Sequence, residues 1–305
     1  MLLDSASLYF RAFFGVPTSI TAPDGTPVNA VRGFLDMVST LVTRYQPTRL
    51  VACLDEDWRP AWRVALLPSY KAHRMAPDAA PTPDGVPDPE EVPDLLAPQV
   101  PILLEVLAAV GIATAGAAGY EADDVIGTLA TRGPGPVDVV TGDRDLIQLV
   151  DDAAGIRVLY TGRGVAKLEE LDAAAVRAKY TVEPSQYADF ATLRGDPSDG
   201  LPGVSGIGEK TAAGLLGRFG DLAGILAAVD ARNRALPATQ WKRLDAAREY
   251  LAVAPTVVKV ACDAPVPQLI DALPDAPVDP ERLTGLAERW GLESAVTRLG
   301  KALAG

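Results

Sequence analysis

Short apolar runs that end in an acid recur through the first half of the chain and most constrain its fold. Residues 2–4, 49–55 and 137–143 each end in aspartate, and residues 156–160 form a further apolar run. Continuous apolar runs of this length are typical of parallel strands that are buried on both faces. The spacing of apolar side chains predicts a helix over residues 29–45, between two of these runs. This alternation predicts an α/β fold with a central, mostly parallel sheet flanked by helices.

The second half of the chain has a helical pattern. We place the boundary between an α/β core of residues 1–167 and a helical region of residues 168–305. Helices are expected over residues 168–180, 184–194, 209–219 and 239–253, with two more within residues 280–303. Before them, residues 76–101 contain eight prolines, which is typical of a surface insertion, with a domain boundary as the alternative.

Composition limits the chemistry that such a fold can carry. His73 is the only histidine, which argues against Ser–His and Cys–His catalysis, and Cys53 and Cys262 are too few for a disulfide framework or a zinc site. Any metal is therefore expected to be held by oxygen ligands, which favours Mg²⁺ or Mn²⁺. No apolar run reaches the roughly 18 residues of a membrane span. The N-terminus lacks the basic segment of a signal peptide, and we expect a cytoplasmic protein.

Acids at the ends of the expected strands form the first candidate site. Asp4, Asp55 and Asp143 each follow an apolar run. Because the carboxyl ends of parallel strands share one edge of a sheet, these side chains are expected to lie close together. Their mutual repulsion favours a divalent cation between them. The alternative is that each acid only caps the next helix or begins a turn.

Six further acids lie in three short segments. Glu121, Asp123 and Asp124 open an expected helix, Asp145 follows Asp143, and Asp196 and Asp199 belong to a Gly-Asp-Pro-Ser-Asp-Gly turn. Nine carboxylates without histidine suit hard metals in a phosphoryl-transfer site, where two ions bind the attacking and leaving oxygens. Without these nine acids the net charge of −12 becomes −3, so the acidic composition no longer argues against a nucleic-acid partner.

A glycine-rich segment, LPGVSGIGEKTA over residues 201–212, predicts a helix–hairpin–helix. Glu209 separates Gly208 from Lys210, so the segment is not a Walker loop. Gly203, Gly206 and Gly208 let backbone N–H groups face outward at the start of the next helix, where they suit a phosphate of a DNA backbone. An ordinary helical hairpin with glycine caps is the alternative.

The segments YEADDVIGTLA, TGDRDLIQLV, GDPSDGLPGVSGIGEKTA and SYKAHR together resemble the bacterial 5′-nuclease and flap endonuclease family. The resemblance covers nearly the whole chain and implies a PIN-like fold. It also implies a helical arch or gateway within residues 58–101 and a helix–3-turn–helix motif at about residues 184–220. No polymerase region follows, so the chain looks like a stand-alone member, and its native start is expected to lie at Met1 or upstream.

The resemblance also implies roles for the acids. Asp4, Asp55 and Asp123 match ligands of a first metal, and Asp123, Asp143, Asp145 and Asp199 surround a second. Glu121, Asp124 and Asp196 match acids that bind metal directly or through water. Because nine acids exceed what two Mg²⁺ ions normally need, we expect two or three Mg²⁺ or Mn²⁺ ions, and K⁺ is a candidate at the hairpin.

The resemblance places DNA contacts on two further segments. Arg63, Lys71 and Arg74 match basic gateway groups over the scissile phosphate, and Tyr70 matches an aromatic that stacks on a base. A solvated basic helix with one packed aromatic is the alternative for these four. The hairpin residues Gly203, Gly206, Gly208, Lys210 and Thr211 match a clamp on the DNA backbone.

The expected activity is that of a divalent-metal-dependent, structure-specific 5′ nuclease with flap endonuclease and 5′-3′ exonuclease action. Expected partners are DNA with 5′ flaps, nicks or gaps and, functionally, a DNA polymerase and a ligase, with the chain as a monomer and no membrane contact. An inactive junction-binding protein and a Mg²⁺-dependent phosphatase are the alternatives. Three features depart from the family pattern: only three residues precede Asp4, no basic residue lies between Arg74 and Arg132, and Gly200 stands where asparagine is frequent.

Overall fold

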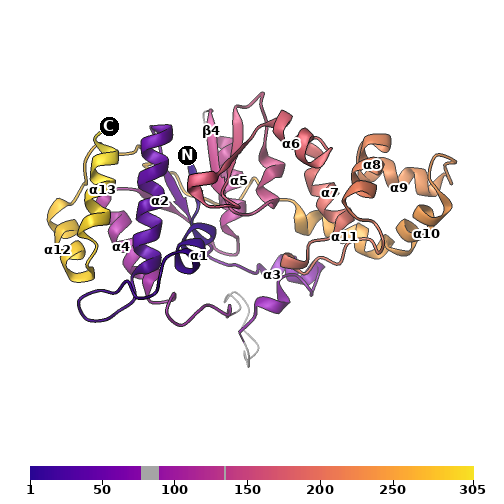
Figure 1. The fold of residues 1–305 in the computed structure, drawn as a ribbon. Helices are drawn as coiled ribbons and strands as arrows, with labels where there is room; N and C mark the ends of the chain where they lie inside the picture. Colours follow the sequence, from indigo (N-terminus) through magenta and orange to yellow (C-terminus); the bar gives the residue numbers. More distant parts are fainter. Residues whose placement is uncertain (77–88, 134) are drawn as a thin grey trace.

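A six-stranded sheet forms the centre of the molecule (Figure 1). The computed structural model describes residues 1–76, 89–133 and 135–305. The strand order is β3-β2-β1-β4-β5-β6, with all neighbours parallel except β6, which runs antiparallel to β5. The strands are β1 Leu2–Asp4, β2 Val51–Cys53, β3 Ala113–Ala115, β4 Val137–Thr141, β5 Ile156–Tyr160 and β6 Glu169–Leu171. The predicted mostly parallel sheet is therefore confirmed.

Helices cover both faces of the sheet because its strands are apolar on both faces. Leu2 and Val139 belong to the core that includes α5 (Ala122–Arg132), whereas Leu3 and Val140 belong to the core of the opposite face. The second core contains residues of α1 (Ser5–Gly15), α2 (Asn29–Tyr45), α4 (Gln99–Val110), α12 (Pro280–Trp290) and α13 (Glu293–Leu303). The last two helices of the chain thus return to this face, where α13 packs against α2 and α12 against α4, as Figure 1 shows in yellow.

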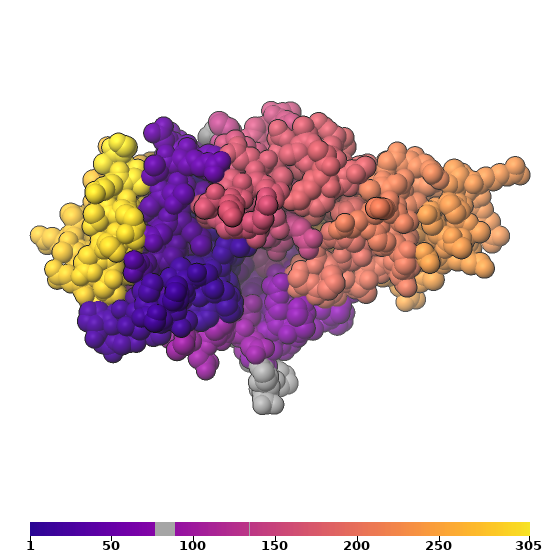
Figure 2. Space-filling model, in the orientation of Figure 1, coloured from indigo at the N-terminus to yellow at the C-terminus, as the bar shows by residue number. Residues whose placement is uncertain are grey.

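Helices α6 to α11 follow the sheet in the chain, and α8 to α11 form a lobe that extends away from it (Figures 1 and 2). Their bounds are α6 Ala173–Tyr180, α7 Tyr187–Arg194, α8 Glu209–Phe219, α9 Leu222–Asp230, α10 Ala238–Ala246 and α11 Arg248–Val258. The short 3₁₀ helices are η2 (Asp145–Leu149), η3 (Val165–Lys167), η4 (Pro184–Gln186) and η5 (Pro197–Asp199). Of these, η2 contacts both β5 and α7. The core of the α5 face continues into this lobe through Ile207 and Leu216.

Most of the expected helices are confirmed, and two expectations are wrong. Residues 168–180 are not one helix: residues 169–171 form β6 because they pair with β5, and α6 begins only at Ala173. Residues 239–253 belong to two helices, which meet at Ala247. The second of these extends beyond the expected end to Val258, with Pro255 inside it.

The expected gateway contains two short helices, α3 (Ala61–Leu66) and η1 (Ala72–Arg74), with Pro68 between them. Of the proline-rich segment, residues 77–88 lie outside the described residues. On either side of them, the Ala76 N–H donates to the Pro89 carbonyl at 2.9 Å and the Glu91 N–H to the Arg74 carbonyl at 2.8 Å.

Among the described residues, no single helix is both long and apolar enough to cross a membrane, and α8 and α9 pass that test only together, across an 81° bend.

Candidate active site

The carboxyl ends of β1, β2 and β4 bring three predicted acids to one edge of the sheet. Asp4 ends β1 and caps α1, since its Oδ1 accepts from the Ser7 N–H at 3.0 Å. Its Oδ2 accepts from the Thr141 hydroxyl at 2.6 Å, and that hydroxyl oxygen accepts from the Asp143 N–H at 2.8 Å. Asp55 Oδ1 accepts from the Ala122 N–H at 2.7 Å, which joins β2 to the start of α5.

The charges gathered at this edge destabilise one another. Burial, opposed by hydrogen bonds from Thr141 and Ser7, raises the pKa of Asp4 to about 7. Burial and then the negative charge of Asp143 raise the pKa values of Asp123 and Asp145 well above the ordinary range. Asp145 Oδ1 is also buried without a hydrogen-bond partner in the described part of the chain. Acids with these shifts favour either protons or a bound cation.

Arg63 supplies a cation to two of the predicted metal ligands. The side chain is 2% exposed. Its Nη1 lies 2.5 Å from Glu121 Oε2 and 2.6 Å from Asp124 Oδ2, and its Nη2 lies 2.7 Å from Asp124 Oδ1. Its Nε donates to the Val257 carbonyl at 2.9 Å and its Nη2 to the Lys259 carbonyl at 3.2 Å. Arg63 therefore joins α3 to the start of α5 and the end of α11.

Asp124 is fully engaged by these contacts. Besides Arg63, its carboxylate accepts from the Ala261 N–H at 2.8 Å and the Glu121 N–H at 3.2 Å. The backbone contact to Glu121 belongs to a capping box at the start of α5. Asp124 thus has the partners of a structural residue in this conformation.

Glu121 connects Arg63 to the other gateway residues. Lys71 Nζ donates to Glu121 Oε1, and the Tyr70 hydroxyl donates to Glu121 Oε2 at 2.8 Å. Burial alone would lower the pKa of Lys71, but the Glu121 carboxylate outweighs it and raises that pKa well above the usual value. Tyr70 is 4% exposed, so its ring is packed inside the protein rather than presented to solvent.

The gateway segment rests on the Asp196–Gly200 turn. The Lys71 N–H donates to the Asp199 carbonyl at 3.0 Å, and the Ser69 hydroxyl donates to the Gly200 carbonyl at 2.9 Å. Gly200 has φ +70°, and a Cβ there would overlap the Ser69 carbonyl oxygen. The glycine that departs from the family pattern therefore permits a close approach of two backbones.

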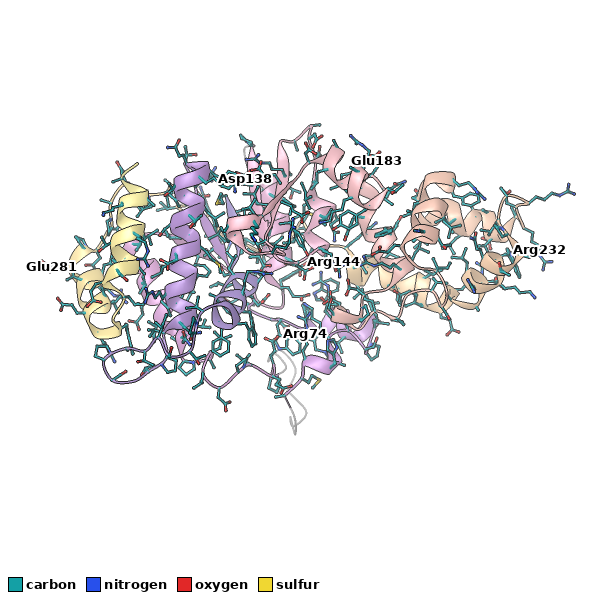
Figure 3. All side chains as sticks on the ribbon, in the orientation of Figure 1. Arg74, Asp138, Arg144, Glu183, Arg232 and Glu281 are labelled. Carbon is teal, nitrogen blue, oxygen red and sulfur yellow. The ribbon has the colours of Figure 1, made fainter. Side chains whose placement is uncertain are left out.

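Cations on both sides of this turn hold its two acids. Arg74 Nη2 donates to the Ser198 carbonyl at 2.8 Å and to Asp199 Oδ1 at 3.2 Å. Arg194 Nη2 donates to Asp196 Oδ2 at 3.0 Å, while Asp196 Oδ1 accepts from the Ser198 N–H at 3.0 Å. Burial raises the pKa of Asp199 to about 6, although Lys71 opposes the shift. Figure 3 shows Arg74 and Arg144 in the region between the sheet and the lobe.

The nine predicted acids thus fall into two groups. Both oxygens of Glu121, Asp124 and Asp196 already accept hydrogen bonds from basic, hydroxyl or backbone groups. The other six acids gather at the sheet edge with fewer cationic partners: Asp4, Asp55, Asp123, Asp143, Asp145 and Asp199. Their all-oxygen donor set, together with the raised pKa values of Asp4, Asp55, Asp123, Asp145 and Asp199, fits a hard divalent cation. Across residues 1–76, 89–133 and 135–305, however, no three acids converge closely enough to hold an ion as they stand, so binding requires them to move together.

The predicted hairpin lies between α7 and α8. Gly203 and Gly206 have φ values of +65° and +75°, which glycine adopts without strain. Gly208 precedes α8, Lys210 is exposed in its first turn, and Thr211 is half-buried. Arg243 of α10 donates to the Gly206 carbonyl at 2.8 Å.

Sequence reasoning did not single out Thr141, Arg194 and Arg243, although each holds part of this site. Thr141 stands next to the Gly142-Asp143 motif, which was a usable signal. Arg194 precedes the Gly195-Asp196 turn and gave a weaker one. Nothing local marks Arg243, because its partner lies 37 residues away.

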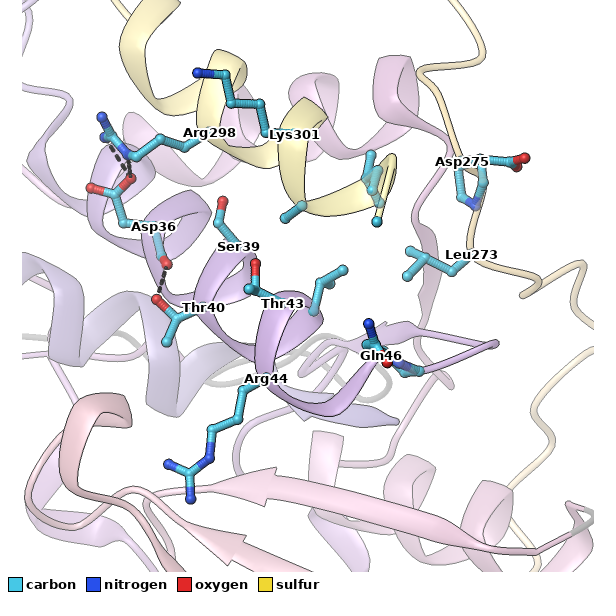
Figure 4. Close-up of a pocket in the computed structure, with 16 residues that line it drawn as sticks. Asp36, Ser39, Thr40, Thr43, Arg44, Gln46, Leu273, Asp275, Arg298 and Lys301 are labelled. Atoms are coloured by element: carbon cyan, nitrogen blue, oxygen red, sulfur yellow. Dashed lines mark hydrogen bonds and ion pairs between the residues drawn. The ribbon is translucent and has the colours of Figure 1, made fainter.

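A separate cavity of about 850 Å³ contains none of these residues. It lies between α2, α13 and residues 273–275, where Arg298 pairs with Asp36 at 2.6 Å (Figure 4). The cavity is therefore distinct from the acid-rich edge.

Family models match the chain in two consecutive parts. Residues 1–181 match the model described as "5'-3' exonuclease, N-terminal resolvase-like domain", and residues 182–281 match "5'-3' exonuclease, C-terminal SAM fold". The chain belongs to the 5′-3′ exonuclease family. The resemblance seen in the sequence motifs is thereby confirmed, whereas the boundary after residue 167 and the individual site residues stay predictions.

Relatives within the 5′-3′ exonuclease family align over nearly the whole chain. A protein named 5'-3' exonuclease from Streptomyces coelicolor is 64% identical over 301 residues, with 98% of both chains covered. One of the same name from Mycobacterium tuberculosis is 55% identical, with 99% of this chain and 97% of the relative covered. DNA polymerase I of Mycobacterium bovis is 43% identical over 76% of this chain, which spans only 24% of that polymerase.

Solved structures confirm the fold of this family member. The T5 D15 protein co-crystallised with metal ions aligns with a TM-score of 0.62 at 18% identity, covering 100% of this chain and 97% of that one. Human GEN1 in complex with Holliday junction DNA aligns with a TM-score of 0.63 at 16% identity, covering 99% and 70%.

Proposed function

We propose that the acid-rich edge of the sheet is the active site of a divalent-metal-dependent, structure-specific 5′ nuclease with flap endonuclease and 5′-3′ exonuclease action. Membership of the 5′-3′ exonuclease family means that the chain hydrolyses DNA phosphodiester bonds. The location is supported by six carboxylates, of which only Asp199 pairs with a lysine or arginine in the described residues, near a buried lysine and a glycine-rich hairpin. A protein that only binds junctions has no use for such repulsion, which costs stability.

The residues that would hold the metal are the six acids of which only Asp199 has a basic partner in the described residues. Asp4, Asp55 and Asp123 would bind one ion, and Asp123, Asp143, Asp145 and Asp199 would surround another. Bound divalent ions supply a water with a lowered pKa and neutralise the oxygens of the phosphodiester. We favour two ions over three, because the oxygens of Asp124 and Asp196 already accept hydrogen bonds from Arg63, Arg194 and neighbouring groups. The donor set suits Mg²⁺ and Mn²⁺ alike, and K⁺ stays a candidate at the hairpin.

Lys71 and Arg74 are the proposed catalytic cations. Both lie on the gateway segment that rests on the Asp196–Gly200 turn, next to the acids. A cation held there stabilises the charge that develops on the phosphate during cleavage. We propose that Arg63, although predicted as a catalytic group, is a positioning residue: it is buried and orients Glu121, which holds Lys71. Tyr70 also holds Glu121 in this conformation, and stacking on a base would require its segment to move.

The hairpin is the proposed clamp on the DNA backbone. The backbone N–H groups of Gly203, Gly206 and Gly208 and the start of α8 suit a phosphate, and Lys210 and Thr211 add side-chain donors. Such contacts do not read sequence, which fits an enzyme that recognises the form of its DNA.

The proposed substrates are 5′ flaps and nicked or gapped duplexes. Relatives named DNA polymerase I support a functional link to a polymerase, and a ligase would act on the nicks that remain. We further propose a cytoplasmic monomer.

Cleavage of an end-labelled 5′-flap duplex by the full chain tests this function. We expect cleavage near the flap junction with Mg²⁺, no cleavage with EDTA, and much slower action on a single strand of the same sequence. Equal cleavage of flap and single strand, or cleavage in EDTA, would contradict it.

A further inference from the structure

The lobe formed by residues 202–248, called here the distal lobe, has a charge opposite to the rest of the protein. It contains seven lysine and arginine residues and four acids, a net charge of +3. Because the whole chain carries −12, the remainder carries −15. Charges of one sign that gather on one part of a molecule create a local field that attracts the opposite charge.

The four acids of the distal lobe are all engaged. Glu209 pairs with Arg194 at 3.5 Å, and Asp221 accepts from the Gly224 N–H as the cap of α9. Arg248 binds both Asp230 and Asp245, at 2.5 and 2.8 Å. Among the described residues, six cations of the lobe consequently have no carboxylate partner: Lys210, Arg218, Arg232, Arg234, Lys242 and Arg243.

These cations extend from the hairpin to the tip of the lobe. Arg243 of α10 donates to the Gly206 carbonyl, and a Cβ on Gly206 would overlap its guanidinium group, so α10 adjoins the hairpin. Arg218 of α8 donates to the Ala235 carbonyl and thereby binds the loop of residues 231–237. This loop carries Arg232, which Figure 3 places at the far end of the lobe.

On α10, the exposed and buried residues separate by face. Lys242 and Arg243 follow Thr239 by three and four positions, so the three side chains lie on one face of the helix. Both cations are exposed. Leu244 is buried in the core of the lobe. The exposed face of α10 therefore presents cations beside the hairpin.

The aromatic residues of the lobe do not suit a single-stranded ligand. Trp241 is half-buried, its indole N–H donates to the Val229 carbonyl at 2.8 Å, and Arg232 lies 5.1 Å from its ring centre. Phe219 packs against the same core. Surfaces for single strands combine cations with exposed aromatic rings on which bases stack, whereas cations without such rings suit the phosphates of a duplex.

We propose that α10 and the loop of residues 231–237 bind the phosphate backbone of duplex DNA beyond the hairpin. This inference rests on the proposed function and extends the hairpin contact along the duplex. A nine-residue helix is about 14 Å long, which corresponds to about four base pairs at 3.4 Å each. The added contacts would set how much duplex the enzyme requires next to the junction.

The test compares the double variant Lys242→Ala/Arg234→Ala with the matched variant Arg282→Ala/Lys301→Ala. The control residues are exposed cations on α12 and α13, at the opposite end of the molecule. Binding of flap DNA is measured against salt concentration on two substrates, one whose duplex arm ends near the hairpin and one whose arm is longer. Single-turnover cleavage at saturating protein is measured in parallel.

We expect the lobe variant to bind the longer substrate about tenfold more weakly, with a salt slope lower by about 2. Binding of the shorter substrate, the saturated cleavage rate and the control variant should remain unchanged. An unchanged salt slope on the longer arm, or equal weakening on both arms, would overturn the inference, and the lobe would then face another partner such as an acidic protein. Failure of wild-type flap cleavage would instead contradict the proposed function, independently of these binding ratios.

Discussion

The sheet edge and the distal lobe carry opposite charges, and we propose that they form the two ends of one DNA-binding surface. At the edge, acids such as Asp4 and Asp123 have strongly raised pKa values because they are buried close to one another. In the lobe, Lys210 and Lys242 are exposed and have no carboxylate partner in the described residues. On this proposal the chain separates chemistry from binding. The acids of the edge would need a bound cation before a phosphate could approach them, whereas the cations of the lobe would bind the phosphate directly.

The largest effect should follow from removing one acid of the edge. Asp143→Asn is expected to slow single-turnover cleavage by roughly 10³-fold or more, since metal stabilisation of the transition state amounts to several kcal/mol. DNA binding should change little, because the hairpin and lobe supply it. A loss of binding as large as the loss of cleavage would break the separation between the two regions.

Arg63 tests whether the edge is held together by a buried ion pair. Arg63→Ala is expected to destabilise the protein by about 3–5 kcal/mol, because Glu121 and Asp124 would be left buried without their cation. Arg298→Ala is the control: its pair with Asp36 is exposed and should contribute about 0–1 kcal/mol. Urea unfolding of both variants measures the difference, and equal midpoints would refute the role given to Arg63.

Lys71 sharpens the comparison with the lobe because it is also a lysine. Lys71→Ala is expected to slow single-turnover cleavage by about 10²-fold, with less than a twofold change in DNA affinity. Lys242→Ala should weaken DNA binding and leave the single-turnover cleavage rate nearly unchanged. If Lys71→Ala instead weakens binding and leaves the rate intact, Lys71 belongs with the DNA-holding cations.

The smallest effect concerns pH and metal. Burial raises the pKa of Asp4 to about 7 and that of Asp199 to about 6, whereas aspartates of an unfolded chain titrate near 3.9. The folded state therefore binds more protons than the unfolded state between about pH 4 and pH 7, and stability should fall as pH rises through this window. In EDTA, the melting temperature should be a few degrees lower at about pH 8 than at about pH 5.

Mg²⁺ at the higher pH should restore the lost stability, since a ligand that binds only the folded state stabilises it. Asp4→Asn should show a weaker pH dependence than the wild type. A metal-free melting temperature that rises with pH and does not respond to Mg²⁺ would contradict this account of the edge.

Local sequence patterns predicted the parts of the fold that local interactions determine. The helix over Asn29–Tyr45 and the strand over Ile156–Tyr160 have the bounds that apolar spacing indicates. Residues 169–171 escaped prediction because their strand depends on pairing with β5. The motifs also located the acids at the sheet edge.

The partners of the charged residues could not be predicted in the same way. The family resemblance implies that Arg63 is a gateway cation over the scissile phosphate, but its acceptors come from α5 and from the end of α11, almost 200 residues away. Likewise, the contact of Arg243 with Gly206 depends on how α10 packs beside the hairpin. Burial and ion pairing of long side chains are set by tertiary packing, which no local pattern records.

An anomalous diffraction map of crystals soaked in Mn²⁺ tests the central claim most directly. We predict two peaks at the sheet edge, bound by oxygens of Asp4, Asp123, Asp143 and their neighbours, with Asp124 still paired to Arg63. A third peak bound by Asp124 or Asp196 would overturn the assignment of those acids to structural contacts. Absence of any peak at this edge at saturating Mn²⁺ would contradict the claim that it is a metal-dependent active site.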